Sequence, residues 1–388
     1  MGKGLISRFC RLSPLGLLAG TGILWVGLTG QTFAADSVGV SGIPSQVLQK
    51  ADESVERALA WLAREQLSSG KFPGRDQGQP AITSLCLLGF LANGYLPGEG
   101  PYGNTIDRGI RFVLSCQRPD GLFSYLEPEP YIQYNNTSYC ANYNFSIAGL
   151  LLSEVYGMTS PDTSGEIRQG VENALKFSYL EQDKPKRTRD QVGGWRYRYP
   201  WPPGRIGGYN SDLSVTSWQV MFLRSAKNAG FDVPTKHIEE AMEFVRNCYD
   251  PNLGTFLYAL YPGSRHVTRA MAGAGIVDLA MGGIHETEMA HNAGKWLLNN
   301  DFDRYGYSPG NDRYHYSAFY ASLGLYLLGD EYFNPFFPRL ARTLIANQSG
   351  DGHWRDTDVE GMYGNAYATA LLVLALSTHN EILPIFQR

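Results

Sequence analysis

QSGDGHW, residues 348–354, stands between two helix-like stretches and contains a glutamine, a tight Asp-Gly turn and one large aromatic residue. Parts of this order recur along the chain in EQLSSGKF (65–72), CQRPDGLF (116–123), QVGGW (191–195), DPNLGTF (250–256) and DRYGY (303–307). The turn glycines are expected to be Gly70, Gly121, Gly194, Gly254, Gly306 and Gly352. A supersecondary unit that returns at such intervals indicates a repeat architecture.

Two kinds of helix-like segment flank each turn. The segment before the turn mixes charged and apolar residues at helical spacing, and it occurs at 54–65, 105–116, 166–181, 236–248, 287–299 and 339–347. The segment after the turn is almost uncharged and rich in small residues, at 81–94, 143–157, 213–230, 267–283, 316–329 and 364–377. A helix that is apolar all round is buried. We therefore predict an all-α fold, an (α/α)6 toroid of six helical hairpins with an apolar inner barrel and an outer ring. An open solenoid of helix pairs is the alternative.

The residues of the turn have an architectural explanation. A helix end leaves backbone carbonyls without intrahelical partners, and a glutamine amide can donate to them. Glycine adopts the left-handed geometry that reverses the chain. The aromatic residue is expected to pack at the start of the following inner helix. We therefore interpret the repeated motif as structural and not as catalytic.

The first residues have the composition of an export signal. MGKGLISRFCR is basic, LSPLGLLAGTGILWVGLTG is apolar, and Thr32-Phe33-Ala34 fits a cleavage box. We predict a signal peptide over 1–34, an N-terminal linker over 35–50 and the toroid over 51–388. The mature protein is then expected to be secreted, in the periplasm or outside the cell, with no transmembrane segment after cleavage. A retained membrane anchor is the alternative.

Charge and cysteine content narrow the possible partners. The net charge is −4 and no Lys/Arg-rich block occurs, so nucleic acid is not an expected partner. Four cysteines remain after the predicted signal, namely Cys86, Cys116, Cys140 and Cys248, and none forms a CxxC pair. Buried thiols and one or two disulfides both remain open.

The Gln-x-x-Asp-Gly-x-Trp turn between paired helices resembles the QW repeat of squalene–hopene and oxidosqualene cyclases. More broadly, residues 50–380 resemble the prenyltransferase and squalene-oxidase repeat superfamily, and the six-hairpin form is similar to the β subunits of protein prenyltransferases. The chain looks closest to exported bacterial members of unknown activity. The resemblance implies the toroid but no single reaction, since function lies in sites built on a fold.

The catalytic motifs of these families are incomplete in this chain. Class II terpene cyclases use Asp-x-Asp-Asp to protonate an alkene, whereas SDLSVTSW (211–218) keeps Asp212 and has Ser214 and Val215 at the acid pair. The protein prenyltransferases bind zinc with Asp, Cys and His. His315 matches the histidine, but His266 stands where a carboxylate and a thiolate would be needed. No cofactor is therefore expected, and zinc at His266 and His315, completed by Asp212, is the alternative.

The six inner helices are expected to begin at one end of the barrel, so that their first residues converge on one mouth, where the helix dipoles favour anions. The candidate catalytic residues at this mouth are Asp212, His266, Arg269, Tyr314 and His315. The candidate ligand-binding residues are Tyr143, Thr216, Trp218, Tyr363 and Tyr367. The structural alternatives are helix capping for Asp212, a hydrogen-bonded histidine for His315 and simple filling of the barrel for the tyrosines.

Three functions fit this pattern. The main expectation is a toroid that binds an apolar or isoprenoid-type ligand in its barrel and lacks the motifs for cyclase or transferase catalysis. The second is a non-catalytic scaffold that interacts with another envelope protein. The third is a carbohydrate-active toroid, such as a polysaccharide lyase or hydrolase, since tyrosine-rich grooves suit sugars.

Overall fold

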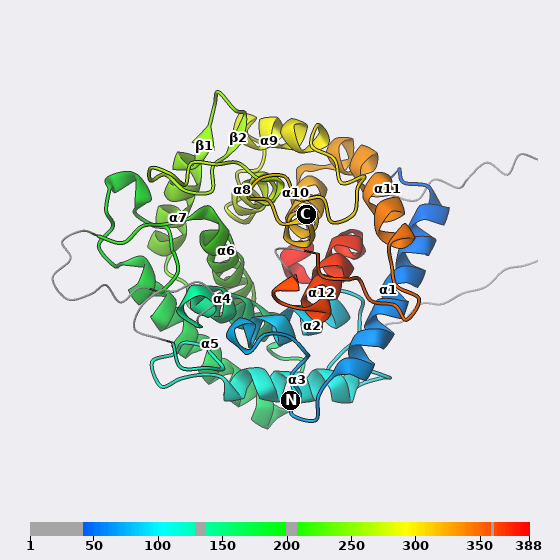
Figure 1. Cartoon of the computed structure of the whole chain (residues 1–388). Coiled ribbons are helices and arrows are strands. Elements are labelled where there is room, and N and C mark those ends of the chain that lie inside the picture. Colours follow the sequence, from blue (N-terminus) through cyan, green and yellow to red (C-terminus); the bar gives the residue numbers. More distant parts are fainter. Residues whose placement is uncertain (1–41, 129–136, 199–207, 358–360) are drawn as a thin grey trace, which may run out of the picture. The chain divides into compact units, whose positions relative to one another are not determined.

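The computed structural model describes residues 42–128, 137–198, 208–357 and 361–388, all within the unit Ser37–Arg388 (Figure 1). The helices of this part are α1 (Ser45–Glu65), α2 (Ala81–Leu91), α3 (Gly103–Ser115), α4 (Thr137–Val155), α5 (Pro161–Gln182), α6 (Leu213–Asn228), α7 (Thr235–Asn247), α8 (Arg269–Met281), α9 (Glu288–Leu298), α10 (Tyr314–Leu328), α11 (Asp330–Ala346) and α12 (Asn365–Leu376). The strands β1 (Tyr249–Asp250) and β2 (Thr255–Phe256) form a small antiparallel hairpin. The all-α prediction is confirmed.

The even-numbered helices form a closed inner ring (Figure 1). Each packs against the next from α2 to α12, and α12 packs against α2. Small residues permit this close packing, because a Cβ added to Gly273 of α8 would lie 2.5 Å from the backbone of Tyr320 in α10. All 11 residues of α2 are buried, as its charge-free sequence predicts. The contact between α12 and α2 closes the ring and excludes the open solenoid.

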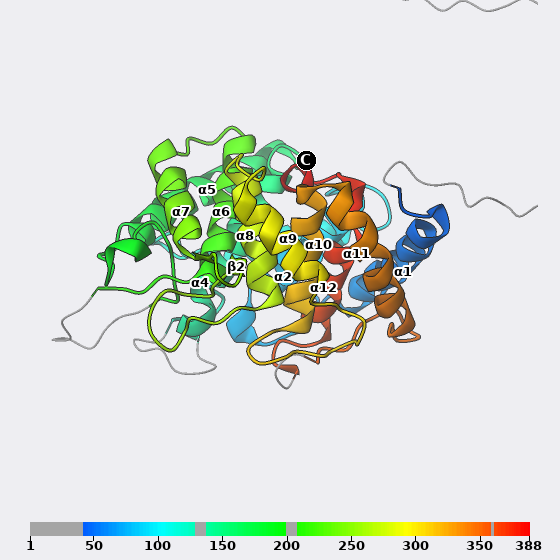
Figure 2. The same ribbon diagram turned by 90° about the horizontal axis from the view of Figure 1, so that it is seen from above.

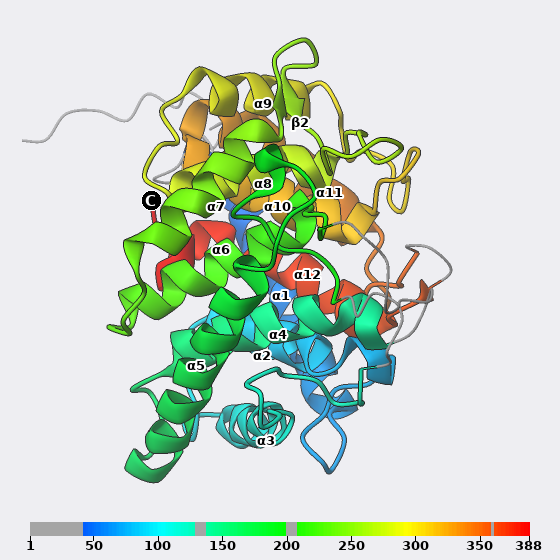
Figure 3. The same cartoon turned by 90° about the vertical axis from the view of Figure 1, so that its left-hand side faces the viewer.

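The odd-numbered helices lie outside this ring. Figure 2 shows α9 and α11 beside α8 and α10, and Figure 3 views the side on which α5 and α7 pack against the inner helix α6. Helix α1 buries Val55, Ala58, Leu59 and Leu62, which share one face at i, i+3, i+4 and i+7. Residues 45–50, which we expected in a linker, form the first turns of this helix.

The glutamines of the repeat join neighbouring outer helices. Gln348 Nε2 donates to the carbonyl oxygens of Gly352 in the turn and Ser54 in α1, at 2.7 and 2.8 Å. Gln66, Gln117 and Gln182 make the same pair of bonds to their own turn glycine and to Thr105, Gly170 and His237 of the next outer helix. The predicted donation to carbonyls is thus present, but the second acceptor lies on the following hairpin. Gln348 thereby connects the last repeat to the first.

The third turn differs from the sequence prediction. Gly193, with φ 87°, is the turn glycine, and not Gly194. A Cβ on Gly193 would lie 2.0 Å from the carbonyl oxygen of Glu240, so only glycine fits there. The glutamine of this third turn is Gln182, which donates to the carbonyl oxygen of Gly193. Residues 183–192 separate the end of α5 from the turn glycine. Gln191, which the sequence pattern assigns to the motif, lies in this inserted segment, and its Oε1 accepts a hydrogen bond from Ser211 N.

The turn aromatics are anchored by threonines of the inner helices. The backbone N–H groups of Trp195 and Trp354 each donate to a threonine hydroxyl at 3.0 Å, on Thr216 and Thr369 respectively. Both indole rings are fully buried. These bonds confirm the expected packing of the turn aromatic at the start of the inner helix.

The four cysteines beyond the predicted signal are all free and buried. They are therefore buried thiols and do not form the disulfides that the sequence had left open. Within the described ranges, no helix has both the length and the apolarity to cross a bilayer. The predicted signal peptide over 1–34 and the first part of the predicted linker lie outside the described residues.

Candidate functional site

A cavity of about 330 Å³ lies in the inner barrel, where the N-terminal halves of all six inner helices meet. This convergence is the geometry expected of helices that begin at the same end. The apolar part of its wall comes from Ala81, Ile82, Leu85, Ile147, Ala270 and Met271. The aromatic part comes from Trp218 and the tyrosines Tyr139, Tyr143, Tyr197, Tyr258, Tyr316, Tyr363 and Tyr367.

Five of the residues singled out from the sequence line this cavity. Four are aromatic candidates for ligand binding, and the fifth, His266, stacks on Tyr258 with ring centroids 4.9 Å apart. Burial lowers the pKa of His266, so its imidazole is neutral at pH 7. The aromatic four are Tyr143, Trp218, Tyr363 and Tyr367. Their position at the cavity is a fact of the fold, whereas their role in binding remains a prediction.

Asp212 is placed in the barrel wall, outside the cavity lining. Its Oδ1 accepts from Val215 N at 2.8 Å and caps α6, and its Oδ2 lies 2.8 Å from Arg196 Nη1. Burial lowers the pKa of Arg196 and the carboxylate of Asp212 raises it, with a net upward shift that keeps the guanidinium charged. The capping role that we considered for Asp212 is therefore the one the structure shows.

Arg269 also has a structural position. Its Nε lies 2.5 Å from Asp312 Oδ2, and both side chains are almost completely buried. The other guanidinium nitrogens donate to the carbonyl oxygens of Asp301 and Tyr307, at 2.6 Å each. This arginine therefore joins the start of α8 to the loop that precedes α10 and does not line the cavity.

Tyr314 and His315 are buried behind the cavity wall. The Tyr314 hydroxyl donates to the Phe302 carbonyl at 3.1 Å. His315 Nε2 lies 3.0 Å from the Tyr305 hydroxyl, and its Nδ1 lies 3.9 Å from Asp356 Oδ1. Both residues point away from the space that Tyr316, on the same helix, helps to line.

Thr216 and the alternative zinc set are not part of the cavity either. Thr216 donates to the Asp212 carbonyl at 2.7 Å and anchors Trp195, as described above. Within the described residues, Asp212, His266 and His315 do not form a cluster tight enough to share one ion. The zinc alternative is therefore not supported by the geometry.

Several cavity residues were missed in the sequence. Tyr197 and Tyr258 each stand two positions after a turn aromatic, Trp195 and Phe256, in loops that lead to the inner helices. In an extended segment, alternate residues lie on the same side, so the aromatic at this spacing was a usable signal. Arg313, directly before α10, was also missed.

Hydrogen bonds connect the tyrosine hydroxyls into two groups. The Tyr197 and Tyr258 hydroxyls are 2.7 Å apart, and Arg196 Nη1 donates to Tyr258 at 3.2 Å. On the other side, Trp218 Nε1 donates to the Tyr316 hydroxyl at 3.0 Å. Burial raises the pKa of Tyr197 and Tyr258, so these hydroxyls stay protonated and keep their hydrogen bonds to one another.

The described cavity lining contains no aspartate or glutamate. Its one formally charged side chain is that of Arg313, and its other polar groups are hydroxyls, amides, a thiol and the neutral ring of His266. Such a site can enclose an apolar molecule and donate hydrogen bonds to it. It offers no carboxylic acid or carboxylate for proton transfer.

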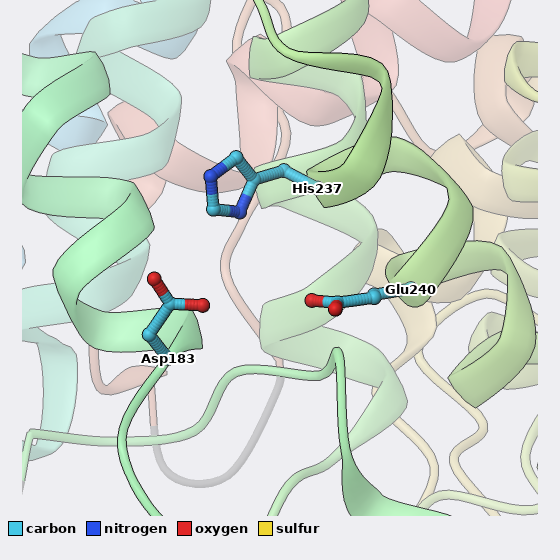
Figure 4. Close-up of side chains that lie close together, drawn as sticks. All are labelled: Asp183, His237 and Glu240. Carbon is cyan, nitrogen blue, oxygen red and sulfur yellow. The ribbon is translucent and has the colours of Figure 1, made fainter.

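A second cluster lies between the outer helices α5 and α7. Figure 4 shows Asp183, His237 and Glu240 facing one another, and candidate ligand atoms of the three lie within 4.8 Å. Gln182 Nε2 already donates to two carbonyls, so its Oε1, 2.6 Å from His237 Nδ1, must accept, and Nδ1 carries the proton. Lys236 Nζ lies 3.7 Å from both carboxylates. We assign this cluster to the helix junction and not to a metal centre.

Comparison with known proteins identifies the fold but not the family. No protein-family model matches the sequence, and no curated protein sequence matches it. Among solved structures, the type II terpene cyclase MstE from Scytonema, in complex with its product merosterolic acid A, is similar at a TM-score of 0.54 and 14% identity, covering 88% of this chain and 99% of the cyclase. These likenesses show an α/α toroid.

Carbohydrate-active proteins are similar to the same extent. An α-1,6-mannanase from Salegentibacter matches at a TM-score of 0.59 and 11% identity, over 84% of this chain and 98% of the mannanase. A D-mannose isomerase matches at 0.57 and 11% identity, over 84% and 97%. Identities this low establish the toroid alone, so the function must be argued from the cavity.

Proposed function

We propose that this protein binds a single apolar molecule of the isoprenoid type in its barrel cavity. The observation that carries the proposal is the lining, in which aromatic and aliphatic side chains from six helix starts surround a space with no carboxylate among the described residues. A concave, mainly apolar site with a few polar groups is typical of small-molecule binding. Its volume of about 330 Å³ lies within the range of such sites.

The aromatic surface favours an unsaturated hydrocarbon. Trp218 stacks on Phe319 with an interplanar angle of 4°, which holds its ring rigidly beside the cavity. Burial of apolar ligand surface contributes about 25 cal/mol per Å², so about 200 Å² of contact would contribute about 5 kcal/mol. The QW-like turns and the likeness to a type II terpene cyclase that holds its product merosterolic acid A support this ligand class.

Cyclisation is not part of the proposal, because the described lining of the cavity contains no strong acid. Asp212, the remnant of the acid motif, is paired with Arg196 and caps a helix. Burial raises the pKa of Tyr143 and Tyr197, which makes these hydroxyls poorer acids than free tyrosine. Protonation of an alkene needs a far stronger donor than either group.

A carbohydrate ligand is the second candidate. The ring of tyrosine hydroxyls around the cavity favours it, and so do the structural likenesses to a mannanase and a mannose isomerase. Most glycoside hydrolases need two carboxyl groups that flank the bond. The described lining has none, so a sugar bound here would meet a binding or isomerising site more readily than a hydrolytic one.

Titration with matched probes tests the proposal. Farnesol and α-1,6-mannotetraose are added to the protein while tryptophan fluorescence and binding heat are recorded, since Trp218 lines the cavity. Saturable binding of farnesol, abolished in the cavity-filling variants Ala270→Trp and Ile147→Phe, supports the isoprenoid reading. Binding of the mannotetraose alone would favour the carbohydrate candidate, and binding of neither would favour a scaffold that contacts another envelope protein. Circular dichroism of each variant checks that the barrel still folds.

Export is also part of the proposal, because residues 1–34 have the composition of a signal peptide. N-terminal sequencing of the protein from fractionated cells tests it. A mature chain that begins just after Ala34 in the periplasmic or extracellular fraction is expected, whereas an intact N-terminus in the membrane fraction would indicate the retained anchor.

A further inference from the structure

We infer that the ligand carries an anionic group, a carboxylate or a phosphate, which Arg313 binds at the mouth of the cavity. This inference rests on the proposed function and adds a polar end to the apolar ligand. The ligand class becomes an amphipathic acid whose hydrocarbon part fills the barrel.

The first observation is the contrast among three arginines around the mouth. Arg196 and Arg269 are each neutralised by a buried aspartate. Arg313 lines the cavity, and its Nη1 donates to the backbone carbonyl of Asp312 at 2.9 Å. No ion pair joins Arg313 to a carboxylate of the described residues, and its side chain makes no capping bond to α10. A guanidinium without a counterion beside a ligand cavity is suited to bind an oxyanion.

The second observation places this charge across the cavity. Tyr139 belongs to α4, whereas Arg313 precedes α10, and these two helices are not neighbours in the inner ring. Burial raises the pKa of Tyr139, and the positive charge of Arg313 opposes this rise. Both residues line the same cavity, so the guanidinium and the Tyr139 hydroxyl border one space from two different inner helices.

The third observation concerns the direction of the hydrogen bonds. Arg196 can only donate, so the Tyr258 oxygen accepts from it and the Tyr258 proton turns toward Tyr197 at 2.7 Å. Tyr197 in turn donates to the Tyr139 hydroxyl at 3.4 Å. This donor chain leads to Tyr139, which lines the cavity together with Arg313. The guanidinium beside these neutral hydroxyls favours a ligand group with negative charge.

Among the described residues, the cavity lining contains no side chain with a negative charge. Among its described residues are no carboxylates, and the polar groups beside Arg313 include the amide of Asn311. Because Arg313 itself is exposed to water, the expected gain is moderate, about tenfold in affinity.

Calorimetry at neutral pH tests the inference with three probes that share the same type of hydrocarbon chain and differ in the polar end group. The probes are farnesol, farnesoic acid and farnesyl phosphate. The wild type is expected to bind at least one of the two anions about tenfold more tightly than the alcohol. Arg313→Gln should remove this preference, because it should weaken the binding of the anions about tenfold and that of farnesol much less, and Arg313→Lys should retain part of it. The control is Arg342→Gln, which changes an exposed arginine on the outer helix α11 and should alter nothing.

The outcomes separate the inference from the proposed function. If the alcohol and both anions bind equally well, or if Arg313→Gln keeps the preference, the anion inference is wrong while the apolar site stands. If none of the three probes binds to the folded wild type, the proposed function fails and takes the inference with it. The stronger of the two anions identifies the acid as a carboxylate or as a phosphate.

Discussion

At the scale of the residue, buried charges near the barrel mouth are arranged in pairs that fix the inner helices. The Arg269–Asp312 pair is deeply buried and gains further bonds, since the Ser317 hydroxyl donates to Asp312 Oδ1 at 2.5 Å. A buried ion pair adds little stability compared with well-packed apolar residues of similar volume. The loss of one partner is nevertheless destabilising, because it leaves an uncompensated buried charge. Such pairs explain why polar residues at helix starts need not belong to a binding site.

Replacement of Asp312 by alanine should therefore be severe. We expect the free energy of unfolding to fall by about 3–5 kcal/mol, because Arg269 would be left charged and buried. Urea denaturation measures this change. Glu172→Ala, which removes an exposed partner of Arg168 on α5, serves as the control and should have little effect. A similar small effect for both variants would contradict the structural role of the pair.

Glu154 provides a prediction for pH. Burial raises the pKa of Glu154 to about 7, although a hydrogen bond from the Ser225 hydroxyl opposes the shift. The pKa of Glu154 in the folded protein lies above its pKa in the unfolded chain. The contribution of Glu154 to the free energy of unfolding is therefore fully present below the pKa of the unfolded chain. It is lost as pH rises through about 7, by about 3 kcal/mol.

Urea denaturation between about pH 5 and about pH 8 should show this fall in the wild type. In Glu154→Gln the fall should be smaller, because the amide does not titrate. The same pH slope in both proteins would show that Glu154 is not the group responsible.

At the scale of the element, the hairpins could be predicted because each depends on a local pattern. Apolar periodicity, helix length and the Gly-aromatic turn are all present within a few dozen residues. The third turn was misassigned because an insertion separates Gln182 from Gly193, although the two meet in space. The hydrogen bond between the glutamine and the turn glycine is thus kept, although the insertion changes their spacing in the sequence.

The site was less predictable, since it depends on the rotation of each inner helix about its axis. Successive residues differ by about 100°, so neighbours at one helix start face different directions. Tyr316 lines the cavity, whereas Tyr314 and His315 bond to the loops behind it. In α6, Ser214 lines the cavity while Asp212 caps the helix. Polarity at a helix start indicated the correct end of the barrel but not which side chains face inward.

The glutamine bridges give a prediction for single elements. Gln348→Ala removes the two bonds from α11 to its turn and to α1, together with a bond from the Ser54 hydroxyl to Gln348 Oε1 at 2.8 Å. We expect the free energy of unfolding to fall by about 1–3 kcal/mol and amide hydrogens to exchange faster at the start of the turn between α11 and α12. Gln49→Ala, on the exposed side of α1, is the matched control. Equal stability of the two variants would refute the bridging role.

At the scale of the whole described unit, closure of the inner ring creates the cavity. The contact of α12 with α2 brings residues from the two ends of the chain into one wall, where Ile82 and Tyr367 both line the space. Neither residue could form a pocket with its neighbours in sequence alone. The central claim is therefore that this closed barrel holds a ligand.

Native mass spectrometry of the mature protein, purified gently from the cells that make it, tests that claim most directly. The expected result is a reproducible extra mass of one amphipathic organic molecule per chain, which leaves on mild activation and is missing in the folded cavity-filling variant Ala270→Trp. A bare polypeptide mass in both proteins would contradict the account and leave the barrel as a scaffold.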